Sequence, residues 1–471
     1  MIALSLLTSI IYIHASYKSQ FWIEKLEEST MLELLSSGLV TVWLNMAGVE
    51  VKPLEALETL TWQSSPGVVA FPDPNPAAKN TVKKYLQGLV SGKLIDKTLT
   101  KNQGIWIQSG PMLMANNQGT TPVPAASLTK IATSLVAFKT FGANHQFETL
   151  ISTTGTINNG VLSGDLIIQG NGDPLFVWEE AIAVGNSLNK MGIKQVQGNV
   201  IVVGNFAMNF QRNPVLAGQL FKKALNHSTW NRNITLQYSR MAKGTPKPKV
   251  EITGQVKAQN SVVPQTTLLL RHNSLPMKRL IKEMNVFSNN DMAEMLAEVS
   301  GGVDVLRTKA AQLAKVPASE ILLINGSGLG LENRISPRAA CAMLMALQRE
   351  ALAHNLNLAD LFPMSGVDKR GTILFTRNLP KAAVIKTGTL NTVSALAGVL
   401  PTRDRGLVWF AIINRGYRIS AFRSQQGKLL TSLVKQLNVA QKVPSAITPR
   451  AETKALPKFG ALNRTEIVYG G

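Results

Sequence analysis

Between about residues 150 and 280 the spacing of apolar residues changes, and this change constrains the fold more than any other feature. Short apolar or alternating runs are separated there by Gly and Asn, as in 164–169 (GDLIIQ) and 198–204 (GNVIVVG). Such runs are typical of strands, whereas the flanking sequence has the wider apolar spacing of helices. The 471 residues are also too many for one ordinary core. We therefore expect a β-rich domain inserted into a domain of another kind.

The flanking segments predict the domain that holds this insertion. Apolar residues recur at helical spacing from Leu128 to Phe138, and helical character returns at 292–299 and 336–349. Strands are predicted on both sides of these helices, at 104–108, 111–115, 382–386, 393–400 and 406–414. Antiparallel strands with helices beside them indicate an α+β fold.

Changes of composition set the predicted boundaries. The chain divides into an apolar N-terminal segment or export signal (1–48), a Pro-rich linker (49–80), the first part of the α+β domain (81–150), the β-rich insertion (151–280), the second part of the α+β domain (281–440) and a basic mobile tail (441–471). Two apolar runs, 1–15 and 31–48, favour export to the periplasm or cell envelope, and Met31 is an alternative start.

The chain is basic, with 49 Lys and Arg against 28 Asp and Glu. A basic surface attracts any polyanion. However, the basic residues are spread along the chain, and aromatic residues make up only 6%. The sequence also contains no motif of a known nucleic-acid-binding module. We expect no nucleic-acid partner, and attribute the charge to peripheral contact with a membrane surface or an anionic wall polymer.

Cysteine and histidine point to no metal site, and no cofactor is expected. The single cysteine, Cys341, lies in an apolar run and is predicted to be a buried core thiol. The five histidines have no metal-binding spacing, and no GxSxG motif accompanies them, which argues against a histidine-based triad.

Three short sequence motifs indicate a catalytic site through their order along the chain and their predicted local structure. The first is Ser127-Leu128-Thr129-Lys130, which follows a Pro-containing loop and opens the predicted helix. Residues three apart share a helical face, so Lys130 would touch Ser127. A desolvated lysine can be neutral and accept the proton of an attacking serine hydroxyl. The alternative is a helix-capping serine with a surface lysine.

The other two elements are Ser288-Asn289-Asn290 and Lys386-Thr387-Gly388. The first stands at a loop-to-helix junction, where Ser288 could instead cap the helix and Asn290 could serve the turn. The second is predicted to end a strand, where a cation and a hydroxyl can bind a substrate carboxylate and Gly388 leaves the strand edge open. An exposed strand-end lysine is the alternative there.

Together these elements resemble the SxxK, SxN and KTG signature of the penicillin-recognising serine enzymes. The 161 residues from Ser127 to Ser288, which hold the insertion, resemble in particular the class C low-molecular-mass penicillin-binding proteins, the DacB-type D-alanyl-D-alanine carboxypeptidase/endopeptidase family (peptidase family S13). The resemblance covers about residues 100–435 and extends to secondary matches such as Gly170-Asn171-Gly172-Asp173-Pro174 and Gly326-Ser327-Gly328-Leu329. It implies a β-lactamase/transpeptidase-like domain.

The resemblance also implies roles for the site residues. Ser127 would be the nucleophile and Lys130 its base, with Ser288 relaying a proton and Asn290 holding Lys130. Peptidoglycan stem peptides would be the substrates and β-lactams the inhibitors. The residues expected to bind the substrate are Lys386, Thr387, Gly388 and Thr389.

The sequence departs from the family pattern in places. Asn325 stands where Asp is common, and Lys369-Arg370 interrupts an Asp-Gly-Thr run, here Asp368 and then Gly371-Thr372. Two other functions stay open: a serine β-lactamase with the same three elements, and a catalytically inactive wall-binding scaffold of the same fold.

Overall fold

The computed structural model describes residues 71–261, 263–375, 378–454 and 456–469. The predicted export segment and most of the predicted linker lie outside these residues. The folded body begins before residue 80: β1 (Phe71–Pro72) pairs with β3 (Met112–Asn117), and α5 (Ala77–Ser91) follows directly. The prolines are compatible with this, because an edge strand and a helix N-cap do not need the N–H that proline lacks. Residues 71–80 are therefore wrongly assigned to a linker.

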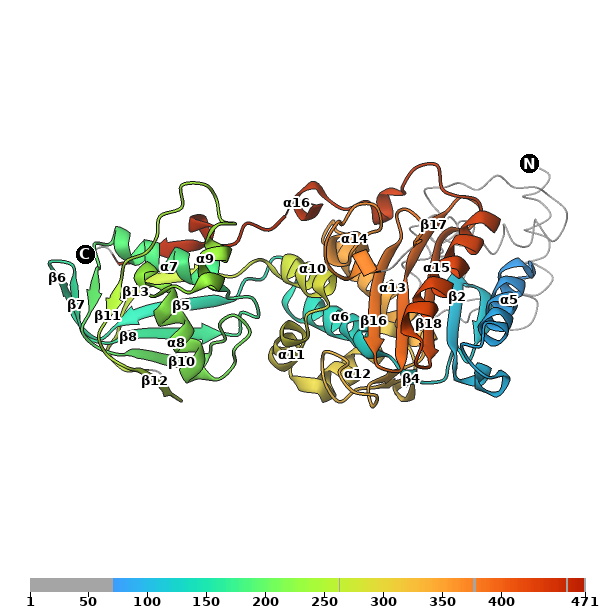
Figure 1. Cartoon of the computed structure of the whole chain (residues 1–471), viewed down its shortest axis with the longest axis horizontal. Coiled ribbons are helices and arrows are strands. Elements are labelled where there is room, and N and C mark those ends of the chain that lie inside the picture. The colour runs from blue at the N-terminus through green and yellow to red at the C-terminus, as the bar shows by residue number, and fades with distance from the viewer. Residues whose placement is uncertain (1–70, 262, 376–377, 455, 470–471) are drawn as a thin grey trace, which may run out of the picture. The chain divides into compact units, whose positions relative to one another are not determined.

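A central sheet organises the α+β domain (Figure 1). Its order is β1-β3-β2-β18-β17-β16, in which β2 is Gly104–Ser109, β18 is Gly406–Arg415, β17 is Val393–Thr402 and β16 is Val384–Leu390. All neighbouring pairs except β1 with β3 are antiparallel. The predicted strands are thus confirmed, and β16 forms one edge of the sheet.

Helices cover both faces of this sheet, which explains the continuous apolar runs of its strands. Alternate residues of β18, such as Phe410 and Trp409, enter two different cores. One core lies under α5 and α15 (Ile419–Gln436). The other is filled by a helical layer made of α6 (Thr129–Phe141), α10 (Met277–Phe287), α11 (Asn290–Val299), α12 (Gly302–Ala314), α13 (Pro337–Ala353) and the short α14 (Leu358–Leu361). Among the described helices, none combines the length and apolarity needed to span a membrane.

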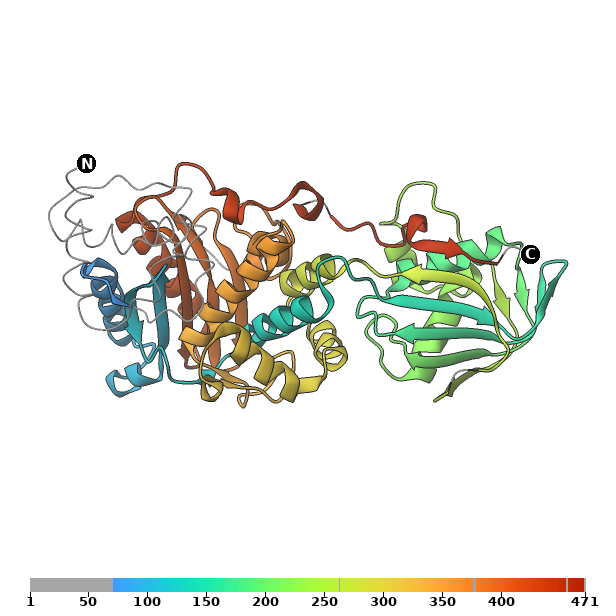
Figure 2. The same cartoon turned by 180° about the vertical axis from the view of Figure 1, so that it is seen from behind.

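The β-rich insertion has its own hydrophobic core. Figure 2 shows the strands and helices of this domain. One sheet has the order β12-β10-β8-β5-β13-β19, made of β12 (Val256–Gln259), β10 (Val200–Asn205), β8 (Leu166–Asn171), β5 (Glu148–Thr153), β13 (Thr267–Asn273) and β19 (Thr465–Ile467). A smaller sheet has the order β11-β9-β7-β6, made of β11 (Glu251–Ile252), β9 (Gln195–Val196), β7 (Val161–Ser163) and β6 (Thr156–Asn158). Three helices pack here as well: α7 (Trp178–Lys190), α8 (Pro214–Ala224) and α9 (Arg232–Tyr238).

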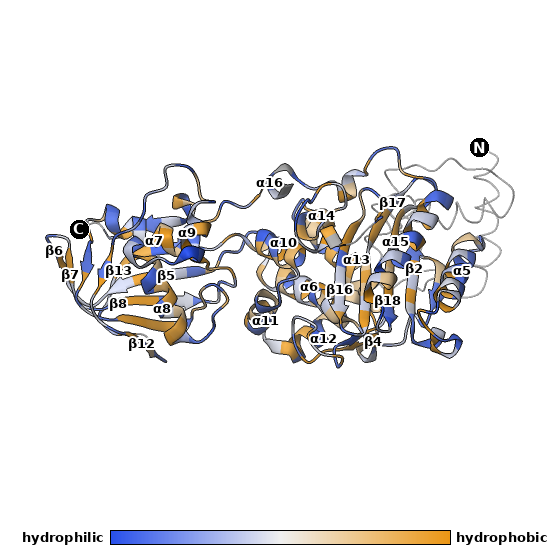
Figure 3. Ribbon diagram, viewed as in Figure 1, coloured by the Kyte–Doolittle hydropathy of each residue, from blue (hydrophilic) through white to orange (hydrophobic). Residues whose placement is uncertain are grey.

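The hydropathy of the residues matches this division into cores. Figure 3 shows hydrophobic residues along the strands of both large sheets and on the helices next to them. Cys341 on α13 is fully buried, and burial raises the pKa of its thiol far above the ordinary value. A thiol that stays protonated in an apolar core is a packing group, as the sequence predicts.

The predicted mobile tail is wrong for the described residues of 441–471. β19 extends the large sheet of the insertion by pairing antiparallel with β13. Further back, the buried carboxylate of Asp360 accepts hydrogen bonds from the Arg450 N–H, at 2.7 Å, and from the Thr453 hydroxyl. These contacts are single and widely spaced, so they leave no apolar periodicity in the sequence, and this is why the pattern suggests a free tail.

Candidate active site

Ser127 lies in the short turn that leads into α6. The turn is a 3₁₀ segment, Ala126–Leu128, and the α-helix begins at Thr129, two residues later than the sequence predicts. Lys130 is nevertheless on the same face, and its Nζ lies 3.1 Å from Ser127 Oγ. Ala126 has φ of +49°, a left-handed conformation that is unfavourable for a residue with a Cβ. Such local strain is concentrated at functional sites.

Lys130 is fully buried and has no carboxylate partner among the described residues. Its ammonium donates to Asn290 Oδ1 and to the Ser327 carbonyl, both at 2.7 Å. Burial lowers the pKa of Lys130 to about 7, against weaker opposing effects of Glu294 and Asp291. A large fraction of this lysine is therefore neutral near neutral pH and can accept a proton.

The segment from Ser288 to Asn290 connects two helices. Ser288 ends α10 with φ of +54°, and Asn289 caps α11 by accepting a hydrogen bond from the Met292 N–H at 2.9 Å. The capping role thus belongs to Asn289 and not to Ser288. This leaves the side chain of Ser288 for Lys386 and that of Asn290 for Lys130.

Lys386 approaches the same point from β16. Its Nζ donates to Ser288 Oγ and to the Thr387 carbonyl, both at 2.8 Å. Burial, and then the positive charge of Lys130, lowers the pKa of Lys386 well below its ordinary value. The strand continues to Leu390, so the Lys-Thr-Gly element lies within an edge strand and does not end it, which corrects the prediction from the sequence. An edge strand offers a substrate backbone a line of unpaired groups.

A third buried lysine shows how unusual these two are. Lys282 in α10 lies 2.9 Å from Asp368 Oδ2, and this ion pair offsets part of the cost of burying its charge, although burial still lowers the pKa of Lys282. Within the described residues, the hydrogen bonds of Lys130 and Lys386 go only to neutral acceptors. Neutral acceptors favour a lysine that changes its protonation state.

The predicted residues surround a cavity of about 260 Å³. Its lining includes six of the eight predicted site residues, namely Ser127, Ser288, Asn290, Thr387, Gly388 and Thr389, while Lys130 and Lys386 lie behind it. A Cβ on Gly388 would lie 2.9 Å from the Ala125 carbonyl oxygen, next to the turn that holds Ser127. Only glycine therefore allows β16 to approach the nucleophile turn so closely.

The structure adds cavity residues that the sequence did not single out as part of the site. Arg423 of α15 donates to Thr389 Oγ1 at 2.8 Å, and no carboxylate pairs with it among the described residues. Thr387 Oγ1 donates to Thr372 Oγ1 at 3.0 Å. The sequence could have indicated Thr372, because the Gly371-Thr372 pair resembles part of the family pattern. No sequence feature indicated Arg423, because a lone basic residue on an amphipathic helix is usually exposed to solvent.

A second contact orients the Ser327 carbonyl toward Lys130. The Glu294 carboxylate accepts hydrogen bonds from the N–H groups of Gly326 and Ser327, both at 3.0 Å. Asn325, at the position where the family commonly has Asp, still accepts the Gly328 N–H at 2.8 Å. This departure therefore keeps the turn intact, because an amide oxygen serves as an acceptor in place of a carboxylate.

Known proteins are similar to this chain in sequence and in fold. The D-alanyl-D-alanine carboxypeptidase DacB of Haemophilus influenzae is 25% identical over 459 residues, which covers 76% of this chain and 92% of that protein. The structure of penicillin-binding protein 4 (DacB) from the same organism has a TM-score of 0.57 at 19% identity, covering 75% of this chain and 99% of that one. A predatory peptidoglycan endopeptidase of Bdellovibrio bacteriovorus has a TM-score of 0.61 at 20% identity, covering 72% and 94%.

These structural likenesses confirm the predicted fold, a β-lactamase/transpeptidase-like α+β domain with a β-rich insertion. The family itself is established by sequence. The model of the D-Ala-D-Ala carboxypeptidase 3 (S13) family matches residues 86–213 and 211–435, which together make up well over half of the chain. The three motifs lie within the matched residues, and the protein belongs to this family of serine-type D-Ala-D-Ala carboxypeptidases.

Proposed function

We propose that the protein cleaves the terminal D-alanyl-D-alanine bond of peptidoglycan stem peptides through an acyl-enzyme on Ser127. The observation that carries this proposal is the contact of 3.1 Å between Lys130 Nζ and Ser127 Oγ, made by a buried lysine whose pKa lies at about 7. A nucleophile and a base within hydrogen-bond reach are what acyl transfer requires.

In the acylation step, Ser127 Oγ attacks the carbonyl carbon of the penultimate D-alanine, and its proton passes to Lys130 Nζ. Backbone N–H groups of Ser127 and Thr389 would stabilise the oxyanion, at about 3 kcal/mol per donor. The C–N bond then breaks, and the proton taken up by Lys130 passes through Ser288, which contacts Lys386, to the departing amine, so that Lys130 is neutral again. Water attacks the acyl-enzyme, again with Lys130 as base, and releases the shortened peptide.

The leaving D-alanine carries a carboxylate next to the scissile amide. Thr387 and Thr389 offer hydroxyl groups along β16, and Arg423 provides positive charge beside them. A bound carboxylate would in addition favour the ammonium form of Lys386. An arginine that hydrogen-bonds one hydroxyl still has further N–H groups for a carboxylate. We assign the recognition of this carboxylate to these four residues.

Where the amine of a cross-link comes from a diamino acid with a carboxylate beside it, the same recognition applies, so endopeptidase activity belongs to the proposal. A related predatory endopeptidase of Bdellovibrio bacteriovorus is known in a penicillin G acylated form. We infer that β-lactams acylate Ser127 here too, since their strained amide and carboxylate imitate the substrate end. We infer from the wall substrate that the protein works in the periplasm or cell envelope, and that its net positive charge favours contact with an anionic polymer or membrane there.

The test is covalent labelling with a fluorescent penicillin, followed by its decay on a denaturing gel. The parent protein should carry a label that decays slowly, Ser127→Ala should carry none, and Ser91→Ala, which changes an exposed serine of α5, should label like the parent. A label that forms and vanishes quickly would identify a β-lactamase. A folded parent that never labels would indicate the inactive scaffold.

A further inference from the structure

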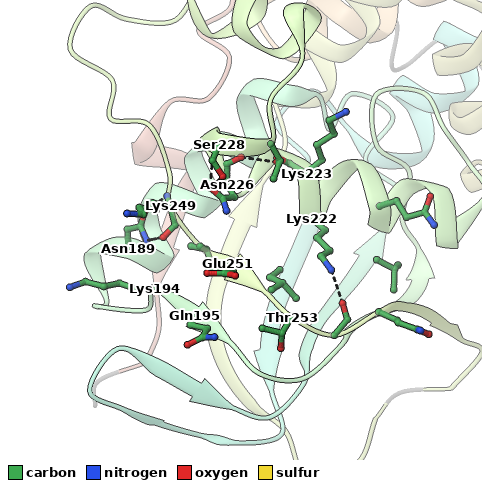
Figure 4. Close-up of a pocket in the computed structure, with 17 residues that line it drawn as sticks. Asn189, Lys194, Gln195, Lys222, Lys223, Asn226, Ser228, Lys249, Glu251 and Thr253 are labelled. Carbon is green, nitrogen blue, oxygen red and sulfur yellow. Dashed lines mark hydrogen bonds between the residues drawn. The ribbon is translucent and has the colours of Figure 1, made fainter.

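An open groove of about 1380 Å³ lies in the inserted domain, lined by the end of α8, by residues near β9 and by the segment 249–256 (Figure 4). It is about five times as large as the 260 Å³ cavity beside Ser127. Sites for single small molecules usually have about 300–1,000 Å³. The size of the groove therefore favours an extended ligand.

Four lysines line the groove: Lys194, Lys222, Lys223 and Lys249. None of them forms an ion pair within the described parts of the chain. Lys222 donates to the Gly254 carbonyl at 2.6 Å, which holds its ammonium at the groove wall without neutralising it. In Figure 4 the labelled lysines are spread around the groove and do not converge on one point. This spacing fits a ligand with repeated negative charges better than a single anion.

The groove wall is held in place by hydrogen bonds that the side chain of Asn189 and neighbouring backbone groups make to segment 249–253. Asn189 clamps Lys249 on both sides, because its Oδ1 accepts the Lys249 N–H at 2.7 Å and its Nδ2 donates to the Lys249 carbonyl at 3.0 Å. The N–H groups of Glu251 and Thr253 donate to the carbonyls of Lys194 and Val196. A rigid wall reduces the entropy that is lost on binding a ligand.

The remaining lining mixes polar and apolar groups: Glu251 carries a negative charge, and Val250, Ile252 and Val256 are apolar. The rest consists largely of amides and hydroxyls, among them Gln195, Gln219, Asn226, Thr229, Thr253 and Gln255. No aromatic residue lines the groove in the described chain. Grooves that bind single-stranded nucleic acids stack bases on aromatic rings, so this lining does not fit such a partner. Amides and hydroxyls instead suit the N-acetyl and hydroxyl groups of an amino-sugar polymer.

We propose that this groove binds a peptide-bearing glycan strand of peptidoglycan, at a stretch other than the peptide being cleaved. The inference rests on the proposed function, which supplies this polymer as the substrate. Stem peptides repeat their carboxylates along the strand and would meet the four ammonium groups. A second attachment to the same polymer raises the effective concentration of cleavable ends.

The test compares two full-length variants with the same change of net charge. In the groove variant Lys194, Lys222, Lys223 and Lys249 become Gln. In the control variant four exposed lysines of the α+β domain become Gln: Lys83, Lys84, Lys309 and Lys428. Binding to purified insoluble peptidoglycan is measured by sedimentation in a Ser127→Ala background, and the melting temperature of each variant checks folding.

The groove variant should bind the polymer about tenfold more weakly, and the control variant less than twofold. With Ser127 restored, the groove variant should cleave a short soluble peptide as the parent does, but show a higher KM on the polymer. Equal losses in both variants, or no loss in the groove variant, would overturn the inference. Failure of the proposed function is a separate result, since the parent would then cleave neither the short peptide nor the polymer.

Discussion

Lys386 donates a hydrogen bond of 2.8 Å to Ser288 Oγ, although 98 residues separate the two along the chain. Lys130 and Ser127 form a second lysine–serine pair at 3.1 Å. Neither lysine has a carboxylate to offset its buried charge among the described residues. A buried cation without such a partner is costly, and an arriving substrate carboxylate would reduce that cost. The site is therefore electrostatically prepared for an anionic substrate.

Removing the hydroxyl of Ser288 should stop the proton relay to the leaving amine. We expect Ser288→Ala to lower kcat/KM for a D-alanyl-D-alanine peptide by about 100-fold or more, the usual contribution of a general acid. Ser288 already holds a φ of +54°, which alanine would keep and which glycine adopts without strain, so Ser288→Gly is a second variant that removes the hydroxyl and relieves this strain. Wild-type kinetics in Ser288→Gly would show that the relay is wrong.

The rate should depend on the protonation of Lys130. Only the neutral amine accepts a proton, and its pKa of about 7 predicts that kcat/KM rises tenfold per pH unit below pH 7 and levels off above it. Asn290→Asp places a negative charge beside Lys130, where Asn290 Oδ1 now accepts a hydrogen bond from Lys130 Nζ at 2.7 Å. This charge favours the ammonium form of Lys130, so the rise of kcat/KM with pH should shift to higher pH. If kcat/KM of the variant rises over the same pH range as that of the parent, Lys130 is excluded as the titrating base.

Arg423 should matter for binding more than for chemistry. Loss of a charge-assisted hydrogen bond to the substrate carboxylate costs about 1.5–3 kcal/mol, so Arg423→Gln should raise KM about tenfold or more with a smaller change in kcat. Lys428→Gln on the same helix is the control, since Lys428 is exposed and lies outside the cavity. Equal KM values in the two variants would remove Arg423 from the carboxylate site.

Gly328 should be needed to hold the nucleophile turn. A Cβ there would lie 1.9 Å from the Ala126 carbonyl oxygen, at a φ of +83°. We expect Gly328→Ala to slow penicillin acylation of Ser127 severely. Gly244→Ala is a close control, because Gly244 has φ of +85° but nothing within 4 Å of the added carbon. If both variants acylate at the same rate, the close approach has no functional role.

Asp360 should anchor the C-terminal segment. Its buried carboxylate accepts hydrogen bonds from the N–H groups of Asn357 and Arg450 and from the Thr453 hydroxyl. Asp360→Ala leaves these donors unsatisfied and should lower the free energy of unfolding by about 3 kcal/mol, measured by urea titration. Proteolysis near residues 440–460 should also accelerate. Asp304→Ala, at a side chain that is 85% exposed, should change neither measurement.

Part of this site was readable from local sequence. Ser127 and Lys130 are three residues apart, and residues at this spacing share a face in an α-helix and in the 3₁₀ turn that precedes α6, so their contact could be predicted from the sequence. The order of the three motifs and the length of the insertion led to the family. Arg423 and the carbonyl of Ser327 were not predicted as site groups, because each reaches the site through packing between segments far apart in the chain.

The sequence by itself therefore determined the reacting groups, the strands and helices that carry them, and the β-rich insertion between Ser127 and Ser288. These follow from spacing and periodicity, which act over a few residues. The tertiary structure alone decided that Lys130 and Lys386 are buried beside neutral acceptors while Lys282 is paired with Asp368. Burial and charge pairing depend on groups far apart in the chain, and these set the pKa values on which the chemistry rests.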